Sequence, residues 1–198
     1  MAELARLGAT YIQMDAPHYA LLIDPATRGF YEQQAARAGH SASIQQWLGR
    51  ALELDNAVIS AAPAATFGFH LCRGNQASRW LAEGSYEPIA STVFRKIKAH
   101  RLLLEYDDVR SGSFEPLRHV PDDKFVVLGL ITTKTPHMES QQELTERVHD
   151  ASRYVPLERL ALSPQCGFAS SVIGNRISLE DEKRKLRLLT ETARAVWR

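Results

Sequence analysis

Short apolar runs alternate along the chain with longer stretches in which apolar residues recur every three or four positions. The short runs predict β-strands and the longer stretches predict amphipathic helices. A regular alternation of strand and helix is typical of βα units around a parallel sheet, so an α/β fold is expected. The predicted strands are Ala9–Met14, Thr66–Cys72, Arg101–Tyr106, Phe125–Ile131 and Leu160–Ser163, and the predicted helices are Ser41–Ser60, Tyr86–Ala99, Glu139–Tyr154 and Ser178–Arg198.

The composition, with 44% hydrophobic and 24% charged residues among 198, predicts a soluble globular protein. No Gly/Ser-rich linker, low-complexity tract or internal repeat divides the chain, so residues 1–198 are predicted to form a single domain. The formal net charge of +1 provides no basic excess for binding nucleic acid. No apolar stretch approaches the roughly 20 residues that span a bilayer, and no signal-peptide pattern opens the chain. A cytoplasmic protein without a membrane partner is expected.

Several polar residues of the types that catalyse reactions or bind metals lie at or directly after the ends of the predicted strands. Asp15 follows the first strand, His70 and Cys72 end the second, Glu105 lies near the end of the third, and Cys166 follows the fifth. The carboxyl ends of parallel strands gather at one edge of the sheet, and this edge carries the chemistry in α/β folds. We therefore expect these side chains to converge.

His70, Cys72 and Cys166 are three ligands of the kind that zinc prefers. His70 and Cys72 are two residues apart, so they face the same side if they belong to one strand. Zinc binds about four thiolate, imidazole or carboxylate donors, and Glu105 is the expected fourth because an acidic residue after three leucines needs a partner. Two neighbouring carboxylates compete with it for this place, Asp107 and Asp108.

Two simpler interpretations of the same residues stay open. A cysteine near a strand end is often a small buried hydrophobic residue, and a single histidine is often a core residue with satisfied hydrogen bonds. A catalytic Cys–His pair is a further chemical alternative, but no third group that would orient the imidazole is evident. Both cysteines lie next to turn-forming residues and one is paired with a histidine, which favours the metal site.

Several of these segments together resemble a known family. The segments His70–Asn75 and Leu162–Phe168, with Glu105 between them, are similar to the zinc signature of the cobalamin-independent methionine synthase family. The resemblance is to the C-terminal catalytic barrel and to shorter relatives, which include epoxyalkane:coenzyme M transferase-like proteins. Tyr11–Pro17 is similar to the family strand that ends in Asp-Glu-Pro, and Gly129–Pro136 to the segment before its last strand.

The resemblance implies a TIM (β/α)8 barrel fold, here truncated to about the last five βα units. It also implies zinc-dependent alkyl or methyl transfer, with the metal held by His70, Cys72, Glu105 and Cys166. The acceptor would be a small-molecule thiol, homocysteine or a coenzyme M-like compound, and a second substrate would donate the alkyl group. A TIM barrel needs eight strands. A second copy of the chain or a partner chain would complete the barrel; the alternatives are a truncated gene product or a rearrangement into a smaller closed sheet.

The resemblance also suggests roles for residues around the metal. Asp15 corresponds to the family aspartate that contacts the amino group of the thiol substrate, although a turn cap before Pro17 is an alternative for it. Gln13 lies on the same strand face. Lys134 stands where methionine synthases place a proton-donating histidine, and Ala16 replaces their glutamate. Arg73 and Asn75 follow the first ligand pair and are expected to bind an anionic substrate group. The rival function is a non-catalytic, zinc-stabilised domain or assembly subunit.

Overall fold

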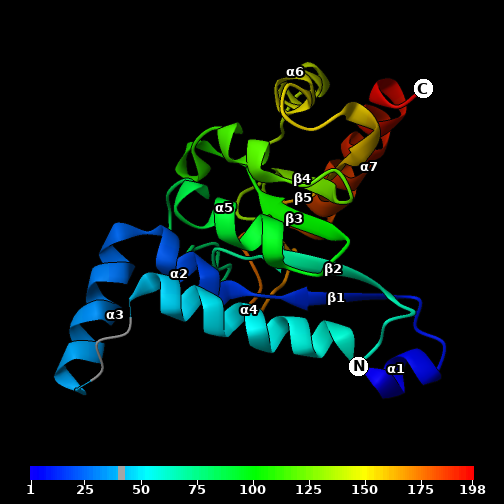
Figure 1. The fold of residues 1–198 in the computed structure, drawn as a ribbon. Coiled ribbons are helices and arrows are strands. Elements are labelled where there is room, and N and C mark those ends of the chain that lie inside the picture. The colour runs from blue at the N-terminus through cyan, green and yellow to red at the C-terminus, as the bar shows by residue number, and fades with distance from the viewer. Residues whose placement is uncertain (40–42) are drawn as a thin grey trace.

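Five parallel strands form one sheet in the order in which they occur along the chain, β1-β2-β3-β4-β5. The structure is a computed structural model, and it describes residues 1–39 and 43–198. Figure 1 shows α4 and α5 lying across one side of this sheet, with α7 on the far side of the view. The strands are β1 (Tyr11–Asp15), β2 (Thr66–Leu71), β3 (Arg101–Glu105), β4 (Phe125–Ile131) and β5 (Leu160–Pro164). The helices are α1 (Ala2–Arg6), α2 (Ala20–Ile23), α3 (Pro25–Arg37), α4 (Ile44–Ser60), α5 (Glu87–Lys96), α6 (Gln141–Ser152) and α7 (Leu179–Val196).

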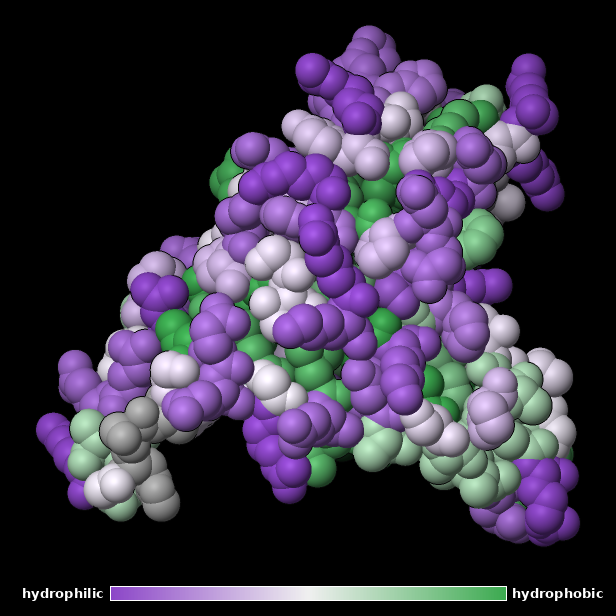
Figure 2. Space-filling view, viewed as in Figure 1, coloured by the Kyte–Doolittle hydropathy of each residue, from purple (hydrophilic) through white to green (hydrophobic). Residues whose placement is uncertain are grey.

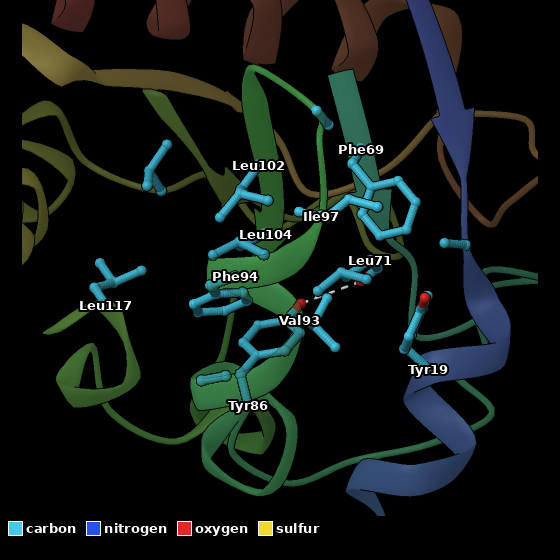
Figure 3. Close-up of a cluster of buried hydrophobic side chains, with 14 of the residues drawn as sticks. Tyr19, Phe69, Leu71, Tyr86, Val93, Phe94, Ile97, Leu102, Leu104 and Leu117 are labelled. Carbon is cyan, nitrogen blue, oxygen red and sulfur yellow. Dashed lines mark hydrogen bonds between the residues drawn. The ribbon is translucent and has the colours of Figure 1, made fainter. Parts of the chain in front are cut away.

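The sheet packs one of its faces against helices, and the main core lies there. Phe69 and Leu71 of β2 and Leu102 of β3 point to this face and are fully buried. Val93 and Phe94 of α5 belong to the same buried cluster, which Figure 3 shows. Within that cluster the Tyr86 hydroxyl donates a hydrogen bond of 3.2 Å to the Leu71 carbonyl. Alternation along each strand then directs the remaining side chains to the other face.

The second face of the sheet is much more open. Tyr11 at the start of β1 is 42% exposed and Phe125 at the start of β4 is 46% exposed. Gln13 is also exposed, and Leu103 and Val127 are only partly buried. Parallel sheets are normally covered on both faces, so this face has the character of a barrel interior without its far wall. In Figure 2 further hydrophobic side chains gather where α1 lies, and Leu4 and Leu7 there are 48% and 68% exposed.

The sequence predicted all five strands and four of the helices, with boundaries that differ by a few residues. The predicted start of the first helix at Ser41 lies outside the described residues, and α4 begins after Ser43, whose side chain accepts a hydrogen bond from the Gln46 N–H. The sequence missed α1, α2 and α3. A local signal for α3 was present, because Asp24 caps it and Pro25 takes its first position. No helix among the described segments is long and apolar enough to cross a membrane.

Candidate metal centre

Four side chains that are distant in sequence meet at the carboxyl edge of the sheet. His70 lies on β2 and Cys72 just after it, Glu105 ends β3, and Cys166 lies in the loop after β5. One potential ligand atom from each of the four lies within 4.8 Å of all the others. Three of the side chains are buried and Cys166 is half-buried. These side chains lie close together because the strands are parallel and in register, so that their last inward-facing residues are at the same edge of the sheet.

The spacing of these atoms fits a tetrahedral zinc ion. The two sulfur atoms are 3.9 Å apart, and two zinc–sulfur bonds of about 2.3 Å in a tetrahedron place them ~3.8 Å apart. The Nε2 atom of His70 lies 3.6 Å from Oε1 of Glu105, close to the edge of such a tetrahedron. Both cysteines are free thiols, so no disulfide competes for them. The donor set of two sulfurs, one imidazole and one carboxylate is one that zinc accepts.

Asp15 lies on the other side of the His70 ring. Residues 15 and 70 are register partners in neighbouring strands, and Oδ1 of Asp15 is 3.0 Å from Nδ1 of His70. Burial by itself lowers the pKa of His70, but the hydrogen bonds with Asp15 and Glu105 outweigh this and raise the pKa to about 10. The two carboxylates therefore favour the protonated form of the imidazole.

Glu105 is completely buried and has two partners besides His70. Its Oε1 atom accepts a hydrogen bond of 3.1 Å from the backbone N–H of Arg73, and its Oε2 atom accepts one of 3.2 Å from Arg110. Burial raises the pKa of Glu105, but the hydrogen bond and charge of His70, the charge of Lys134 and the hydrogen bond from the Arg73 N–H together outweigh burial and hold the pKa below its usual value. The carboxylate is thus ionised and fixed in place, as a metal ligand needs to be.

The two thiols are in hydrogen-bonding contact, with their sulfur atoms 3.9 Å apart. The hydrogen bond from the Cys72 thiol lowers the pKa of Cys166 to about 6, and the same bond, with burial, raises the pKa of Cys72. The hydroxyl of Ser170, 3.5 Å from Cys166, also lowers the pKa of Cys166. Of the two cysteines, Cys166 therefore loses its proton more readily.

A cavity of about 260 Å³ opens beside these residues on the inner face of the sheet. Gln13, His70, Gln165 and Cys166 line it, so the position predicted for Gln13 faces the same space as the candidate ligands. Lys134 reaches this region through Gln165, because its Nζ atom donates a hydrogen bond of 3.1 Å to Oε1 of Gln165. The side chain of Lys134 is buried, and burial lowers its pKa.

Arg73 occupies a different place from the one expected for a residue that binds an anionic substrate. Its side chain is fully buried in the core, and the guanidinium stacks 4.1 Å from the centre of the Tyr86 ring. It also donates a hydrogen bond of 2.5 Å to the Gly84 carbonyl. The aromatic ring and the carbonyl hold the cation inside the protein, so it does not face the cavity. Arg73 contributes its backbone N–H to Glu105 instead.

Asn75 ties two loops together. Its Nδ2 atom donates a hydrogen bond of 2.7 Å to the Gly167 carbonyl in the loop after β5, and its Oδ1 atom accepts one of 3.0 Å from Asn175. Its amide also contacts Ser170, at 3.0 Å. With 7% of its surface exposed, Asn75 has little left to offer a substrate. The contacts assign it to holding the Cys166 loop beside the loop after β2.

Sequence reasoning missed two residues that support the centre. Gln165 places its carbonyl 3.2 Å from Nε2 of His70, and Arg110 pairs with Glu105 at 3.2 Å. Arg110 also binds both carboxylates that were alternatives to Glu105, Asp107 at 2.6 Å and Asp108. The acidic cluster Glu105-Tyr106-Asp107-Asp108 carried a signal for Arg110, because closely spaced carboxylates near a buried strand need a cation.

The chain belongs to the family described as cobalamin-independent synthase, catalytic domain, which matches residues 1–178. Together with the five-strand parallel sheet, this membership shows the fold to be the TIM-barrel type, of which the chain contains the part that carries the candidate metal centre.

The comparisons identify relatives of about twice this length. The uncharacterized protein YxjG of Bacillus subtilis is 39% identical over 192 residues, which is 96% of this chain and 50% of YxjG. A methionine synthase of Thermococcus kodakarensis is 23% identical over 164 residues, which is 83% of this chain and 38% of that protein. The chain spans about half the length of the curated relatives YxjG and YxjH that it matches.

Solved structures agree on the fold. A putative vitamin-B12 independent methionine synthase of Listeria monocytogenes superposes with a TM-score of 0.71 and 27% identity, covering 98% of this chain and 50% of that one. A B12-independent methionine synthase of Shewanella sp. W3-18-1, solved in complex with selenomethionine, has a TM-score of 0.68 and 18% identity. The second likeness supports the fold alone. Both confirm the predicted TIM-barrel type, and the chain covers half of each of these proteins.

Proposed function

We propose that this chain carries a zinc-dependent site that transfers an alkyl group, such as methyl, to a thiol. The observation that carries the proposal is the meeting of His70, Cys72, Glu105 and Cys166 within 4.8 Å at the carboxyl edge of the sheet, beside an open cavity. Membership of the cobalamin-independent synthase family supports the same chemistry. When bound, zinc would lower the pKa of a substrate thiol so that its sulfur is a nucleophilic thiolate at neutral pH.

The protein side chains would orient the reactants and handle protons. The Asp15 carboxylate is 56% exposed, so beyond its contact with His70 it is available to the amino group of a thiol such as homocysteine. Gln13 lines the same cavity and offers its amide. Lys134 is the proposed proton donor. Its Nζ atom is held by Gln165 at the edge of the site, and burial lowers its pKa. Orientation of the two reactants would supply most of the rate increase.

The substrates follow from the chemistry of the site. The acceptor would be a small thiol, homocysteine or a coenzyme M-like compound, and a second molecule would donate the alkyl carbon. With homocysteine and a methyl donor the reaction is methionine formation, which gives the protein a place in methionine biosynthesis. The cytoplasmic location expected from the sequence stays a prediction.

The test begins with the metal and compares His70→Asn with His149→Asn. Wild-type protein and the His149→Asn variant should each bind about one zinc per chain, because His149 lies exposed on α6 away from the centre. His70→Asn and Cys72→Ser should bind much less. In a cobalt-substituted sample, homocysteine or coenzyme M should change the thiolate-to-cobalt absorption. Absence of zinc in the wild type, or equal zinc in Cys72→Ser, would refute the proposal.

A non-catalytic, zinc-stabilised domain is the second candidate, and the open inner face of the sheet favours it. The cavity beside the candidate ligands has no far wall among the described residues, so a substrate there would remain in contact with water. Zinc that binds tightly, raises the melting temperature and leaves the cobalt spectrum unchanged with both thiols would establish this structural role.

We further propose that a second polypeptide segment, from a partner chain or a second copy, completes the barrel. Strands β1 and β5 each have one neighbouring strand in the described part of the chain, so each has a free edge. The exposed Tyr11 and Phe125 rings lie on the face that closure would bury. A mass in solution equal to one chain, at concentrations where the metal site is intact, would count against a second copy as the completing segment.

A further inference from the structure

The side chain of Asp15 is placed to act on His70 before any substrate arrives. Asp15 ends β1, His70 lies on β2, and the two residues are direct register partners. Both side chains therefore emerge on the inner face of the sheet, and Oδ1 of Asp15 meets Nδ1 of His70 at 3.0 Å. Backbone pairing fixes the contact, so it does not depend on a mobile loop.

The two nitrogens of the His70 ring have different surroundings. Nδ1 faces Asp15, whereas Nε2 faces Oε1 of Glu105 at 3.6 Å and the Gln165 carbonyl at 3.2 Å. An imidazole that donates from Nδ1 to a carboxylate is held in the tautomer whose Nε2 lone pair is free for a metal. Nε2 is also the nitrogen on the side of the candidate ligands.

We propose that Asp15 is a positioning residue that orients the His70 ring so that Nε2 points toward Glu105, Cys72 and Cys166. This inference rests on the proposed metal site and adds to it a task for Asp15 that contact with a substrate does not require. The carboxylate has two oxygens and is 56% exposed, so Oδ1 can hold His70 while Oδ2 remains available to another group.

The test measures zinc affinity without any thiol, by competition with a chromophoric chelator. Asp15→Ala removes the acceptor of the Nδ1 hydrogen bond and should weaken zinc binding by about 10- to 100-fold, the usual effect of losing a partner of a ligating histidine. Asp15→Asn keeps an oxygen that accepts this bond and should retain affinity within a few-fold of the wild type. Asp123→Ala, an exposed aspartate in the turn before β4, is the matched control and should bind zinc as the wild type does.

A role in substrate contact alone would leave thiol-free zinc affinity unchanged in all three variants, and that result would overturn the inference while the zinc site stood. Equal losses in Asp15→Ala and Asp123→Ala would overturn it as well. Cobalt absorption bands supply a second measurement, because the Asp15→Ala bands should shift as the ring rotates, and circular dichroism checks that the variants fold. A wild type without zinc would refute the proposed function and this inference together.

Discussion

Arg110 is the cation that balances the buried acid groups behind the candidate site. Its side chain is 3% exposed and pairs with Glu105 and Asp107, whose side chains are fully buried. Removal of one partner of a buried ion pair leaves an uncompensated charge and costs about 3–5 kcal/mol. We therefore expect Arg110→Met to lower the free energy of unfolding by about that amount, as measured by urea denaturation of the metal-free protein.

Arg118 provides the matched control. It pairs with Glu87 through side chains that are 41% and 45% exposed, and exposed pairs contribute less than about 1 kcal/mol. Arg118→Met should thus shift the urea midpoint only slightly. Equal shifts in the two variants would show that burial of the Arg110 network contributes nothing particular to stability.

Residue identity predicted which side chains would meet, but not how every one is oriented. The four candidate ligands follow strand ends, and parallel pairing alone brings such positions together. The direction of the Arg73 side chain depends on Tyr86, thirteen residues away in sequence, which offers its ring and hydroxyl. Strand periodicity carries no information about that contact. The sequence therefore did not predict that the Arg73 side chain lies in the core rather than at the cavity.

Strands β4 and β5 approach each other closely at Gly129. A Cβ atom at this position would lie 2.7 Å from the Gln165 Cα atom and 3.0 Å from the Leu104 carbonyl oxygen. Both neighbours are backbone atoms, so the strands themselves would have to move. We expect Gly129→Ala to cost about 1–3 kcal/mol, as overpacking usually does. It should also weaken zinc binding, since displacement of Gln165 moves the adjacent Cys166.

Gly49→Ala is the control for this substitution. Gly49 lies inside α4, and a Cβ there would meet no atom within 4 Å. Alanine in a helix interior is favoured over glycine by roughly 0.5–1 kcal/mol, so the melting temperature should rise. Zinc affinity should not change. A Gly129→Ala protein with wild-type stability and zinc binding would contradict the close approach of β4 and β5.

Element prediction succeeded where hydrophobic periodicity and a cap coincided. Helix α7 has a capping box at Ser178 and Asp181, and the sequence placed its start at the same serine. Helix α3 buries none of its residues, so it has no apolar stripe to find, although Asp24 and Pro25 marked its start. Its helical state depends on local capping and propensity, which a search for periodicity does not detect.

The whole molecule combines a complete helical face with an incomplete barrel interior. The helix-side core is one continuous cluster of buried hydrophobic residues, whereas the inner face exposes Tyr11 and Phe125. The family resemblance predicted a TIM barrel and the strand count predicted five of its eight strands; the solved relatives, of which the chain covers half, confirm the TIM-barrel type. The two edge strands, β1 and β5, present unpaired backbone groups that any further strand could pair with.

Hydrogen exchange offers a direct test of barrel completion. The half of Bacillus subtilis YxjG that lies outside the match is the segment to mix with this chain in that test. Amides on the free edges of β1 and β5 should then gain protection, because new backbone hydrogen bonds remove them from water. Strand β3 should not change, since strands already flank it on both sides.

A variant pair makes this test specific to the inner face. Val127 is half-buried at the middle of β4 and points inward, so Val127→Lys would place a charge where closure needs an apolar wall and should abolish the added protection. Val109 is 95% exposed in a loop outside the sheet, and Val109→Lys should behave as the wild type. Protection that appears equally in both variants would mean that the added segment binds elsewhere, and absence of protection in the wild type would exclude completion by this segment.

The cavity beside the candidate ligands opens on the same inner face as Val127. Closure of the barrel should therefore also reduce solvent access to Gln13 and Cys166.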